Sequence, residues 1–446
     1  MSHIVNPNWK KEYESKKVST AEAVSCIKSG DRVYVGTASS VAYGLLDALW
    51  ARRSELDGVE IQSSQALEAS PIYEEYEDNP FSVNTYFVGV NERKMYRHGM
   101  PVRFTSFHLS EAEIWAKENA MPHVCMFVVS KPDEDGNMSF GPSGVAVQQA
   151  LKEYTREHGG KIILEVNEHE PYVLGESNLI NVSEADFIVE NDRHLLAYET
   201  PASDEIAHQI ASHIMPLVPD GATIQLGLGT ISTAIGYGLM NKNDLGIHTE
   251  LFNQPMLALI ENGNVTNRCK GYMDGVSVYS FSLGTEKLYD FLDHNPSMYC
   301  VPFSVSNDPR NIAKNKKMIS INSTMSIDIY GQCASECMAW NQQSGCGGQL
   351  DFVRGAQWSE GGKSIIATTS SFMKNGKRMS KIVPTFAAGS VVTTPRSDVQ
   401  YVATEYGCVN LKPLSMGDRA RALIELAHPD FRDELTEAAK QHGLIK

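Results

Sequence analysis

The sequence predicts an α/β protein with two similar domains, each built on a mainly parallel sheet. Two observations support this fold class: apolar, β-branched runs of strand length alternate with helical stretches, and the second half of the chain repeats features of the first. The length of 446 residues agrees, because a domain usually has about 100–200 residues. With 42% hydrophobic and 21% charged residues, the composition is that of a folded globular protein.

Strand and helix patterns alternate from the beginning of the chain. Ser19 and Glu22 form a capping-box pattern that opens a short helix. The buried-strand pattern at 32–36 (RVYVG) follows, and then a helical stretch with Leu45 and Leu46. Further strand-type runs occur at 124–129, 161–166, 187–189, 223–226, 298–302, 364–368, 381–383 and 399–403. Helical stretches between many of these runs favour parallel pairing.

An internal repeat relates the two halves. Residues 29–36 (SGDRVYVG) resemble residues 220–227 (DGATIQLG), and both glycines of one copy lie 191 positions from those of the other. Two shorter matches follow in the same order, at 135–137 with 328–332 and at 159–163 with 361–365. A period this long is not that of a solenoid and indicates a duplicated domain.

The boundary between the two copies is predicted near residue 215. Pro216, Pro219 and Gly221 punctuate the chain there, as is typical of a connecting segment. The expected domains are an N-terminal α/β domain at 1–215 and a C-terminal α/β domain at 216–446, which would carry the nucleophile discussed below.

Charge and cysteine usage exclude several classes of protein. The 39 Lys and Arg against 54 Asp and Glu give a formal net charge of −15, which argues against nucleic-acid binding. No apolar run approaches the about 20 residues of a membrane-spanning helix, and the N-terminal residues lack the apolar segment of a signal peptide. The eight scattered cysteines form no zinc-binding pattern and are expected to be reduced. We therefore expect a cytoplasmic protein without a metal site.

A glycine turn is the first candidate for ligand binding. Gly227-Leu228-Gly229-Thr230 follows a predicted strand and opens a helix at 231–240, so backbone N–H groups and the positive end of the helix dipole would face one point. The turn resembles the dinucleotide-binding fingerprint, except that Ser232 stands at the third glycine position. A tight connection without a ligand explains the turn equally well.

Glu250 has two competing interpretations. It follows a short strand at 246–249, and open α/β sheets bind ligands at the carboxyl ends of their strands, where a carboxylate can act as a nucleophile. Alternatively, it is the N-cap of a helix at 251–260. The neighbouring His248 is interpreted as a supporting or packed residue, because the sequence lacks the nucleophile-elbow pattern of a serine hydrolase.

A glycine-rich loop is the third candidate. Three of the five residues Gly345-Cys346-Gly347-Gly348-Gln349 are glycines, which lets the backbone approach a ligand closely and direct N–H groups at developing negative charge. A helix is expected to start directly afterwards. The alternative is a flexible loop that caps this helix, and Cys346 is not favoured as a nucleophile.

Five segments together resemble the acetyl-CoA hydrolase/transferase family. They are GLG at 227–229, HTE at 248–250, SND at 306–308, GGQLDFVRGA at 347–356 and AHPDFR at 427–432. They run in the order of the family and span nearly the whole chain. Within the family, the chain is most similar to the 4-hydroxybutyrate and butyryl-CoA:acetate CoA-transferases. These are class I CoA-transferases, in which two related α/β domains share one chain.

The resemblance implies a role for individual residues. Glu250 would be the nucleophile that forms a glutamyl-CoA thioester, Gly348 would supply a backbone N–H near the thioester carbonyl, and Asn307 would orient the reacting carboxylate. The residues that would bind CoA are Gly227, Leu228, Gly229, Thr230, Ile231, Gly345 and Gly348. Many relatives carry proline where this chain has Ser232.

We therefore expect a CoA-transferase that moves CoA from a butyryl-CoA or 4-hydroxybutyryl-CoA type of donor to acetate or a similar small carboxylate. Acyl-CoA would be a substrate, no cofactor would be tightly bound, and the resemblance implies a homodimer or larger homo-oligomer. Two alternatives stay open: an acyl-CoA hydrolase on the same scaffold, and a non-catalytic CoA- or dinucleotide-binding regulator in which Glu250 would bind only ribose.

Overall fold

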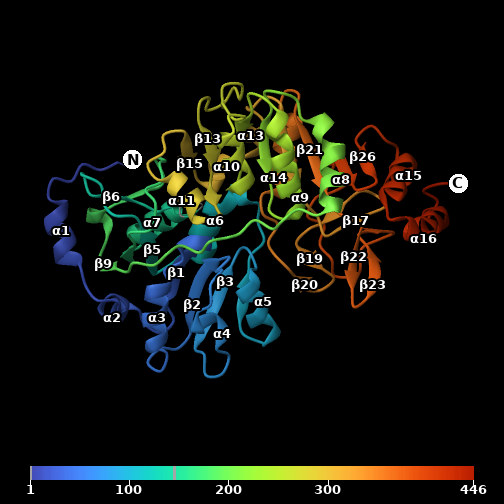
Figure 1. Ribbon diagram of the computed structural model, residues 1–446. Helices are drawn as coiled ribbons and strands as arrows, with labels where there is room; N and C mark the ends of the chain where they lie inside the picture. Colours follow the sequence, from blue (N-terminus) through green and yellow to red (C-terminus); the bar gives the residue numbers. More distant parts are fainter. Residues whose placement is uncertain (1–2, 144–146) are drawn as a thin grey trace. The chain divides into compact units, whose positions relative to one another are not determined.

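A computed structural model describes residues 3–143 and 147–446, which fold into two units (Figure 1). The first unit consists of Met1–Glu199 and Val278–Ser306, and the second unit consists of Thr200–Ser277 and Asn307–Lys446. The division differs from a single break after residue 215. Helix α8 (Glu205–Ile214) packs against α9 (Thr230–Gly238) of the second unit, and residues 278–306 return to the first unit.

The first unit is built on a seven-stranded parallel sheet with the order β4-β3-β2-β1-β5-β7-β9. Its strands are β1 (Arg32–Thr37), β2 (Val59–Ser64), β3 (Phe81–Thr85), β4 (Val102–Phe104), β5 (Val124–Val129), β7 (Lys161–Val166) and β9 (Phe187–Glu190). Val33, Ile61 and Val83 of three neighbouring strands are fully buried against Leu45 and Leu46, as expected for a sheet with both faces covered.

Shorter elements complete the first unit. The helices are α1 (Trp9–Lys16), α2 (Thr20–Ala23), α3 (Tyr43–Ala51), α4 (Pro71–Glu74), α5 (Val90–Arg97), α6 (Ala112–Trp115), α7 (Gln148–Glu157), α11 (Glu286–Leu292) and α12 (Phe303–Ser306). The additional strands are β6 (Asn137–Ser139), β8 (Leu179–Asn181), β13 (Ser277–Tyr279), β14 (Phe281–Ser282) and β15 (Met298–Cys300). The predicted cap at Ser19 is present, since its side chain accepts a hydrogen bond from the backbone N–H of Glu22.

The second unit has a six-stranded sheet with the order β11-β10-β16-β21-β25-β26, in which only the last pair is antiparallel. The strands are β10 (Thr223–Leu226), β11 (Gly246–Ile247), β16 (Met318–Asn322), β21 (Lys363–Ala367), β25 (Tyr401–Thr404) and β26 (Gly407–Asn410). The other helices are α10 (Gln254–Glu261), α13 (Pro309–Ile312), α14 (Gln349–Trp358), α15 (Met416–Leu426) and α16 (Pro429–Gln441). Helix α14 packs on β16 and β21.

Shorter strands complete this unit. They are β12 (Leu251–Phe252), β17 (Ser326–Asp328), β18 (Cys333–Ala334), β19 (Cys337–Met338), β20 (Asn341–Gln342), β22 (Ser371–Lys374), β23 (Lys377–Ser380) and β24 (Ile382–Val383). The run predicted at 381–383 therefore belongs to the small sheet β18-β17-β24 and not to the main sheet.

The two sheets agree with the internal repeat. Strand β1 lies between β2 and β5, as β10 lies between β11 and β16, and the two Gly-Gly-Lys stretches lead into β7 and β21. In the predicted match at 135–137 with 328–332, Gly136 and Asn137 do correspond to Gly331 and Gln332, but the aspartate is paired wrongly. Asp133 Oδ1 accepts the backbone N–H groups of the residues two and four positions later, and Asp328 Oδ1 does the same. The counterpart of Asp328 is thus Asp133, and not Asp135.

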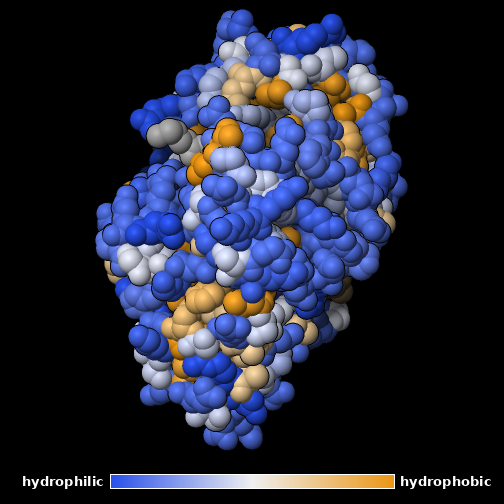
Figure 2. Space-filling model, turned by 90° about the vertical axis from the view of Figure 1, so that its left-hand side faces the viewer, coloured by the Kyte–Doolittle hydropathy of each residue, from blue (hydrophilic) through white to orange (hydrophobic). Residues whose placement is uncertain are grey.

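The surface and the cysteines of the described residues can be compared with the predictions from composition. In that part of the chain, no helix combines the length and the apolar character needed to cross a bilayer. Figure 2 shows a mostly hydrophilic face on which hydrophobic side chains form small separate groups. All eight cysteines are free thiols, four of them buried.

Candidate active site

The candidate site lies in the second unit, where neighbouring parallel strands end. Strand β10 ends at Leu226 and the glycine turn follows, while β11 ends at Ile247 and Glu250 follows three residues later. Strands β10 and β11 are parallel and adjacent, so both segments leave the sheet at the same edge. Strand β10 has on one side β11, the next strand along the chain, and on the other side β16, which comes later in the chain; this is the type of position where α/β sheets bind ligands.

Glu250 forms the centre of a three-residue cluster. The side-chain Nδ2 of Asn307 donates a hydrogen bond of 2.7 Å to Glu250 Oε2. The backbone N–H of Gly348 also donates to this carboxylate. Asn307 is fully buried and Gly348 is buried as well, so protein atoms pack around both hydrogen-bond donors. The structure therefore brings together the three residues for which the family resemblance implies catalytic roles.

Gly348 leaves no space for a side chain. A Cβ at this position would overlap both Glu250 Oε2 and Asn307 Nδ2. The backbone of Gly348 has an ordinary conformation (φ −90°, ψ 10°), so its lack of a side chain serves close approach and not an unusual backbone angle. The carboxylate can contact the loop backbone directly because glycine stands here.

Gln349 fixes the loop that presents Gly348. Gln349 is the first residue of α14, and Gly348 is the N-cap of this helix. The helix therefore starts where the sequence predicted it. Gln349 Oε1 accepts hydrogen bonds from Ser335 Oγ (2.7 Å) and Thr394 Oγ1 (3.0 Å), and its Nε2 donates to the backbone carbonyl of Ser323 (2.7 Å). The position of the Gly348 N–H is thus set by hydrogen bonds to three separate segments.

The environment of Glu250 raises its pKa from 4.5 to about 7. Desolvation by the surrounding protein atoms is the main cause, because it disfavours the charged form, and the hydrogen bonds from Asn307 and Gly348 oppose it. Part of the residue's surface remains accessible to solvent, so a ligand can reach it. At a pH equal to this pKa, the carboxylate is ionised, and therefore nucleophilic, in half of the molecules.

We expect this pKa to be visible in the pH dependence of the first chemical step. As the nucleophile that the family resemblance implies, Glu250 would attack only when ionised, so kcat/KM for an acyl-CoA should rise with pH and reach half of its plateau near pH 7. The variant N307A loses a hydrogen bond that favours the ionised form, and its midpoint should move to higher pH. A flat profile between pH 5 and 9 (a range of about two pH units either side of 7) would show that Glu250 is not the titrating group.

The backbone of the glycine turn has free space beside it, and the helix that follows the turn is mostly buried. Gly229 has a φ of +105° and is the N-cap of α9, and a Cβ added to it would meet no atom within 4 Å. The backbone N–H of Gly227 donates to the carbonyl of Ile321 on β16 (3.2 Å). Leu228 is 40% exposed, whereas Ile231 is buried. The glycine turn in front of α9 is thus accessible, as an anion site requires.

Asn253 is the residue that the sequence interpretation missed. Its Oδ1 accepts from the backbone N–H of Met256, and it is the N-cap of α10, which begins at Gln254. The interpretation of Glu250 as a helix cap is therefore wrong. The signal was present, because Asn253 is followed by a proline at the second helical position, a pattern typical of helix starts.

The remaining predicted residues are placed as follows. His248 is fully buried near the rings of Tyr272 and Phe352, as expected for a packed histidine. Burial raises the pKa of the Cys346 thiol to about 12, so this thiol is protonated at neutral pH. Gly345 is buried in the same loop, and its carbonyl accepts from the Ser344 hydroxyl (2.9 Å).

The corresponding helix start of the first unit is already occupied. The buried Glu165 accepts a hydrogen bond from the backbone N–H of Leu45 in the first turn of α3 (2.9 Å) and another from Asn191 Nδ2 (2.9 Å). A carboxylate of the protein itself therefore satisfies the N-terminus of α3. The equivalent N-terminus of α9 in the second unit is the open one.

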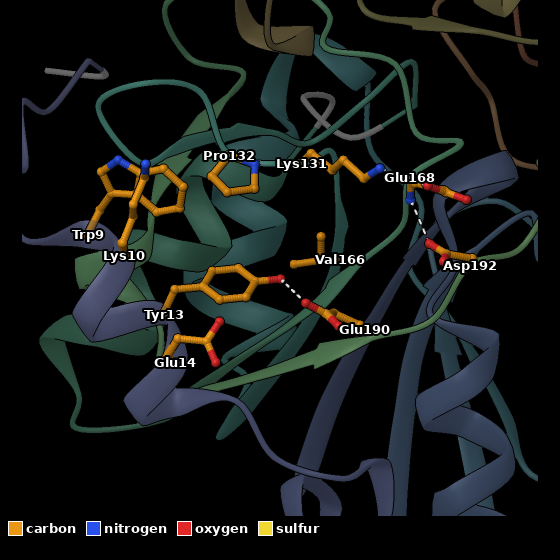
Figure 3. Close-up of a pocket in the computed structure, with 10 residues that line it drawn as sticks. All are labelled: Trp9, Lys10, Tyr13, Glu14, Lys131, Pro132, Val166, Glu168, Glu190 and Asp192. Atoms are coloured by element: carbon orange, nitrogen blue, oxygen red, sulfur yellow. Dashed lines mark hydrogen bonds and ion pairs between the residues drawn. The ribbon is translucent and has the colours of Figure 1, made fainter.

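The first unit also contains a cavity of about 590 Å³ between α1 and the carboxyl ends of β5, β7 and β9 (Figure 3). Its polar side chains largely pair with one another: Tyr13 Oη donates to Glu190 Oε1 (3.0 Å), and Lys131 forms an ion pair with Glu168 (2.7 Å). None of the predicted site residues lines it. Among the residues described in both units, no group of His, Cys, Asp or Glu is arranged to hold a metal ion.

Comparisons with known proteins cover nearly the whole chain. The N-terminal domain model of the acetyl-CoA hydrolase/transferase family matches residues 1–198, and its C-terminal domain model matches residues 284–439. The chain is 38% identical to a succinyl-CoA:cyclohexane-1-carboxylate CoA transferase of Geobacter metallireducens, over 98% of each protein. It is 37% identical to a 4-hydroxybutyrate coenzyme A transferase of Clostridium kluyveri, over 97% of this chain and 99% of the other.

A solved structure shares the fold over the same length. The crystal structure of RipA from Yersinia pestis has a TM-score of 0.90 and 37% identity, and the match covers 98% of this chain and 99% of RipA. The second family model begins at residue 284, within the segment that returns to the first unit. The chain therefore belongs to the acetyl-CoA hydrolase/transferase family of enzymes.

Proposed function

We propose that the protein is a CoA-transferase that moves CoA from a short-chain acyl-CoA, of the butyryl-CoA or 4-hydroxybutyryl-CoA type, to acetate or a similar small carboxylate. The observation that carries this proposal is the Glu250 carboxylate, which is held by Asn307 Nδ2 and the Gly348 N–H and has a pKa of about 7. The names of the two relatives described above support transfer of CoA between carboxylic acids.

The proposed reaction passes through a covalent intermediate on Glu250. The ionised carboxylate attacks the thioester carbonyl, which forms an acyl-glutamyl anhydride and breaks the C–S bond, so CoA leaves as the thiolate. The thiolate then attacks the glutamyl carbonyl of the anhydride, releases the first carboxylate and leaves a glutamyl-CoA thioester. An acceptor carboxylate runs the same two steps in reverse, so charge and atoms balance over the cycle.

Each addition creates a tetrahedral oxyanion, and Gly348 is the proposed donor that stabilises it. A preorganised backbone N–H at such a position contributes about 3–4 kcal/mol to the rate of related acyl transfers. Asn307 would orient Glu250 for attack, since its Nδ2 occupies one lone pair of Oε2. The two groups can act from fixed positions, because both residues are buried.

The proposed CoA site is Gly227, Leu228, Gly229, Thr230 and Ile231, with Gly345 and Gly348 in the second loop. CoA is anionic and the chain carries a net charge of −15, so attraction cannot come from the overall charge. The open N-terminus of α9 offers a local positive field instead. We propose acyl-CoA and small carboxylates as substrates, no tightly bound cofactor, and a homodimer or larger homo-oligomer.

Intact mass spectrometry after incubation with an acyl-CoA tests the proposal. We expect a CoA adduct that maps to Glu250 and disappears on treatment with hydroxylamine, which cleaves thioesters. The same sample without acyl-CoA, and a sample given free CoA alone, serve as controls. If a panel of butyryl-CoA, 4-hydroxybutyryl-CoA, acetyl-CoA and succinyl-CoA gives no adduct, the proposed intermediate is wrong.

Adding acetate then separates transfer from hydrolysis, the other activity in the family's description. A transferase converts acetate to acetyl-CoA in amounts equal to the acyl-CoA consumed. A hydrolase releases free CoA at the same rate with and without acetate. A non-catalytic regulator, the third alternative, would show neither product, and E250A would then weaken CoA binding.

A further inference from the structure

Asn253 uses both ends of its side-chain amide, and it does so while almost fully buried (4% exposed). Its Oδ1 accepts from the backbone N–H of Met256 (3.3 Å), and its Nδ2 donates to the backbone carbonyl of Gly227 (3.2 Å). An amide can accept only through oxygen and donate only through nitrogen, so these two bonds fix its orientation. The second bond is not needed to cap the helix.

The bond to Gly227 connects two parts of the candidate site. Asn253 stands three residues after Glu250, and Gly227 begins the glycine turn in front of α9. The same glycine donates its N–H to Ile321 on β16, so its peptide groups are held from both sides. Asn253 therefore ties the segment that carries the carboxylate to the turn.

Helix packing strengthens this connection. Pro255, in the first turn of α10, lies against Gly236 of α9 so closely that a Cβ at position 236 would overlap its ring. Because α9 and α10 are in direct contact there, the turn before α9 and the residues before α10 cannot shift independently over large distances. The Asn253 bond is the polar part of the same junction.

We propose that Asn253 is a positioning residue that sets the distance between the CoA-binding turn and the Glu250 carboxylate. The inference rests on the proposed function, in which CoA bound at the turn must bring its thioester to Glu250. Reacting atoms must come within about 3–3.5 Å, and a misplacement of about 1 Å lowers a rate by about 100-fold. A single hydrogen bond at this junction is therefore expected to affect catalysis more than folding.

The variant N253D separates the two roles of the side chain. Aspartate is as good a helix cap as asparagine and has the same shape, but its second oxygen cannot donate to the Gly227 carbonyl when ionised. We expect a Tm below that of the wild type, because the ionised side chain would be buried against the Gly227 carbonyl. We also expect a KM for acyl-CoA that rises and a kcat/KM that falls by about 10- to 100-fold. In the uncharged variant N253S the pH midpoint near 7 should stay in place, because Asn253 is not among the groups that shift the pKa of Glu250. In N253D the new carboxylate, three residues from Glu250, should move the midpoint to higher pH.

Matched variants complete the test. N253S retains a capping oxygen on a shorter, uncharged side chain and should show the same fall in kcat/KM as N253D with a Tm closer to that of the wild type, which also covers the case in which N253D does not fold. S415A removes an N-cap of α15 in the same unit and should lower the Tm without changing the KM for acyl-CoA. If N253D and N253S keep a kcat/KM within about twofold of the wild type, a change of only about 0.4 kcal/mol, Asn253 positions nothing. If the wild type itself forms no adduct, the proposed function fails first.

Discussion

The variant E250Q is expected to lose CoA transfer almost completely. Glutamine has nearly the volume of glutamate and can keep the hydrogen bond from Asn307, but it cannot form the anhydride, because its amide is not a nucleophile. Loss of a covalent nucleophile in comparable enzymes lowers kcat by about 10⁴–10⁶-fold. The measurement is the initial rate of acetyl-CoA formation from an acyl-CoA and acetate, followed by liquid chromatography.

The variant E250D provides the matched control. It keeps a carboxylate but shortens the side chain by one methylene, which withdraws the nucleophile from Asn307 and Gly348 and should reduce the rate by about 100-fold. Free-CoA binding should survive in both variants, since the proposed CoA contacts lie in the glycine turn and loop. An E250Q enzyme that keeps more than about 1% of the wild-type rate, well above that expected range, would rule out Glu250 as nucleophile.

The substitution E250Q should also stabilise the folded protein above neutral pH. A pKa raised from 4.5 to about 7 means that the folded state binds a proton at Glu250 more tightly than the unfolded state does. The contribution of Glu250 to stability is therefore greatest below pH 4.5 and declines as the pH rises through 7. At pH 8 the cost reaches up to about 3 kcal/mol, and E250Q avoids it. Thermal unfolding at pH 5 and pH 8 measures this difference.

The variant G348A is the second change expected to abolish activity. Its Cβ would overlap Glu250 Oε2 and Asn307 Nδ2, so the carboxylate, the amide or the loop must move. The backbone N–H is still present in alanine, and any loss therefore comes from displaced geometry. We expect a fall in kcat of at least about 100-fold, the size of effect seen when an oxyanion donor is lost.

A double substitution tests this explanation of G348A. The variant N307A removes one of the two atoms that the new Cβ would overlap. If the clash is the cause, the combined N307A and G348A variant should be more active than the product of the two single effects predicts. Strict multiplication of the two effects, or a G348A enzyme with wild-type kcat, would contradict the steric explanation. Circular dichroism confirms that each variant is folded.

Much of the fold was predictable because periodicity and repetition are local properties. The runs at 124–129 and 161–166 coincide with β5 and β7, and the helix start after Gly348 is confirmed. Glu250 could be placed at the end of a strand for the same reason. The main sheets follow from alternation of strands and helices, which favours parallel order in most α/β proteins.

What could not be predicted depends on contacts between distant segments. Asn307 lies 57 positions from Glu250, and only the family resemblance pointed to it before the hydrogen bond was visible. The bond from Asn253 to the Gly227 carbonyl also joins residues whose proximity no local pattern expresses. The pKa of Glu250 arises from burial by several elements, so the residue type alone could not indicate it.

The return of residues 278–306 to the first unit has a consequence for how the protein is made. As the chain leaves the ribosome, neither unit has all of its residues until position 306 has been synthesised. The second unit must wait longer still, because strands β16, β21 and β25 of its sheet come after that segment. Biosynthesis therefore exposes the partial sheet β10-β11 for the time needed to add the about 75 residues from Ile247 to Asn322, roughly 4–15 s at about 5–20 residues per second. Splitting the gene at residue 215 would separate the first unit from residues that belong to it.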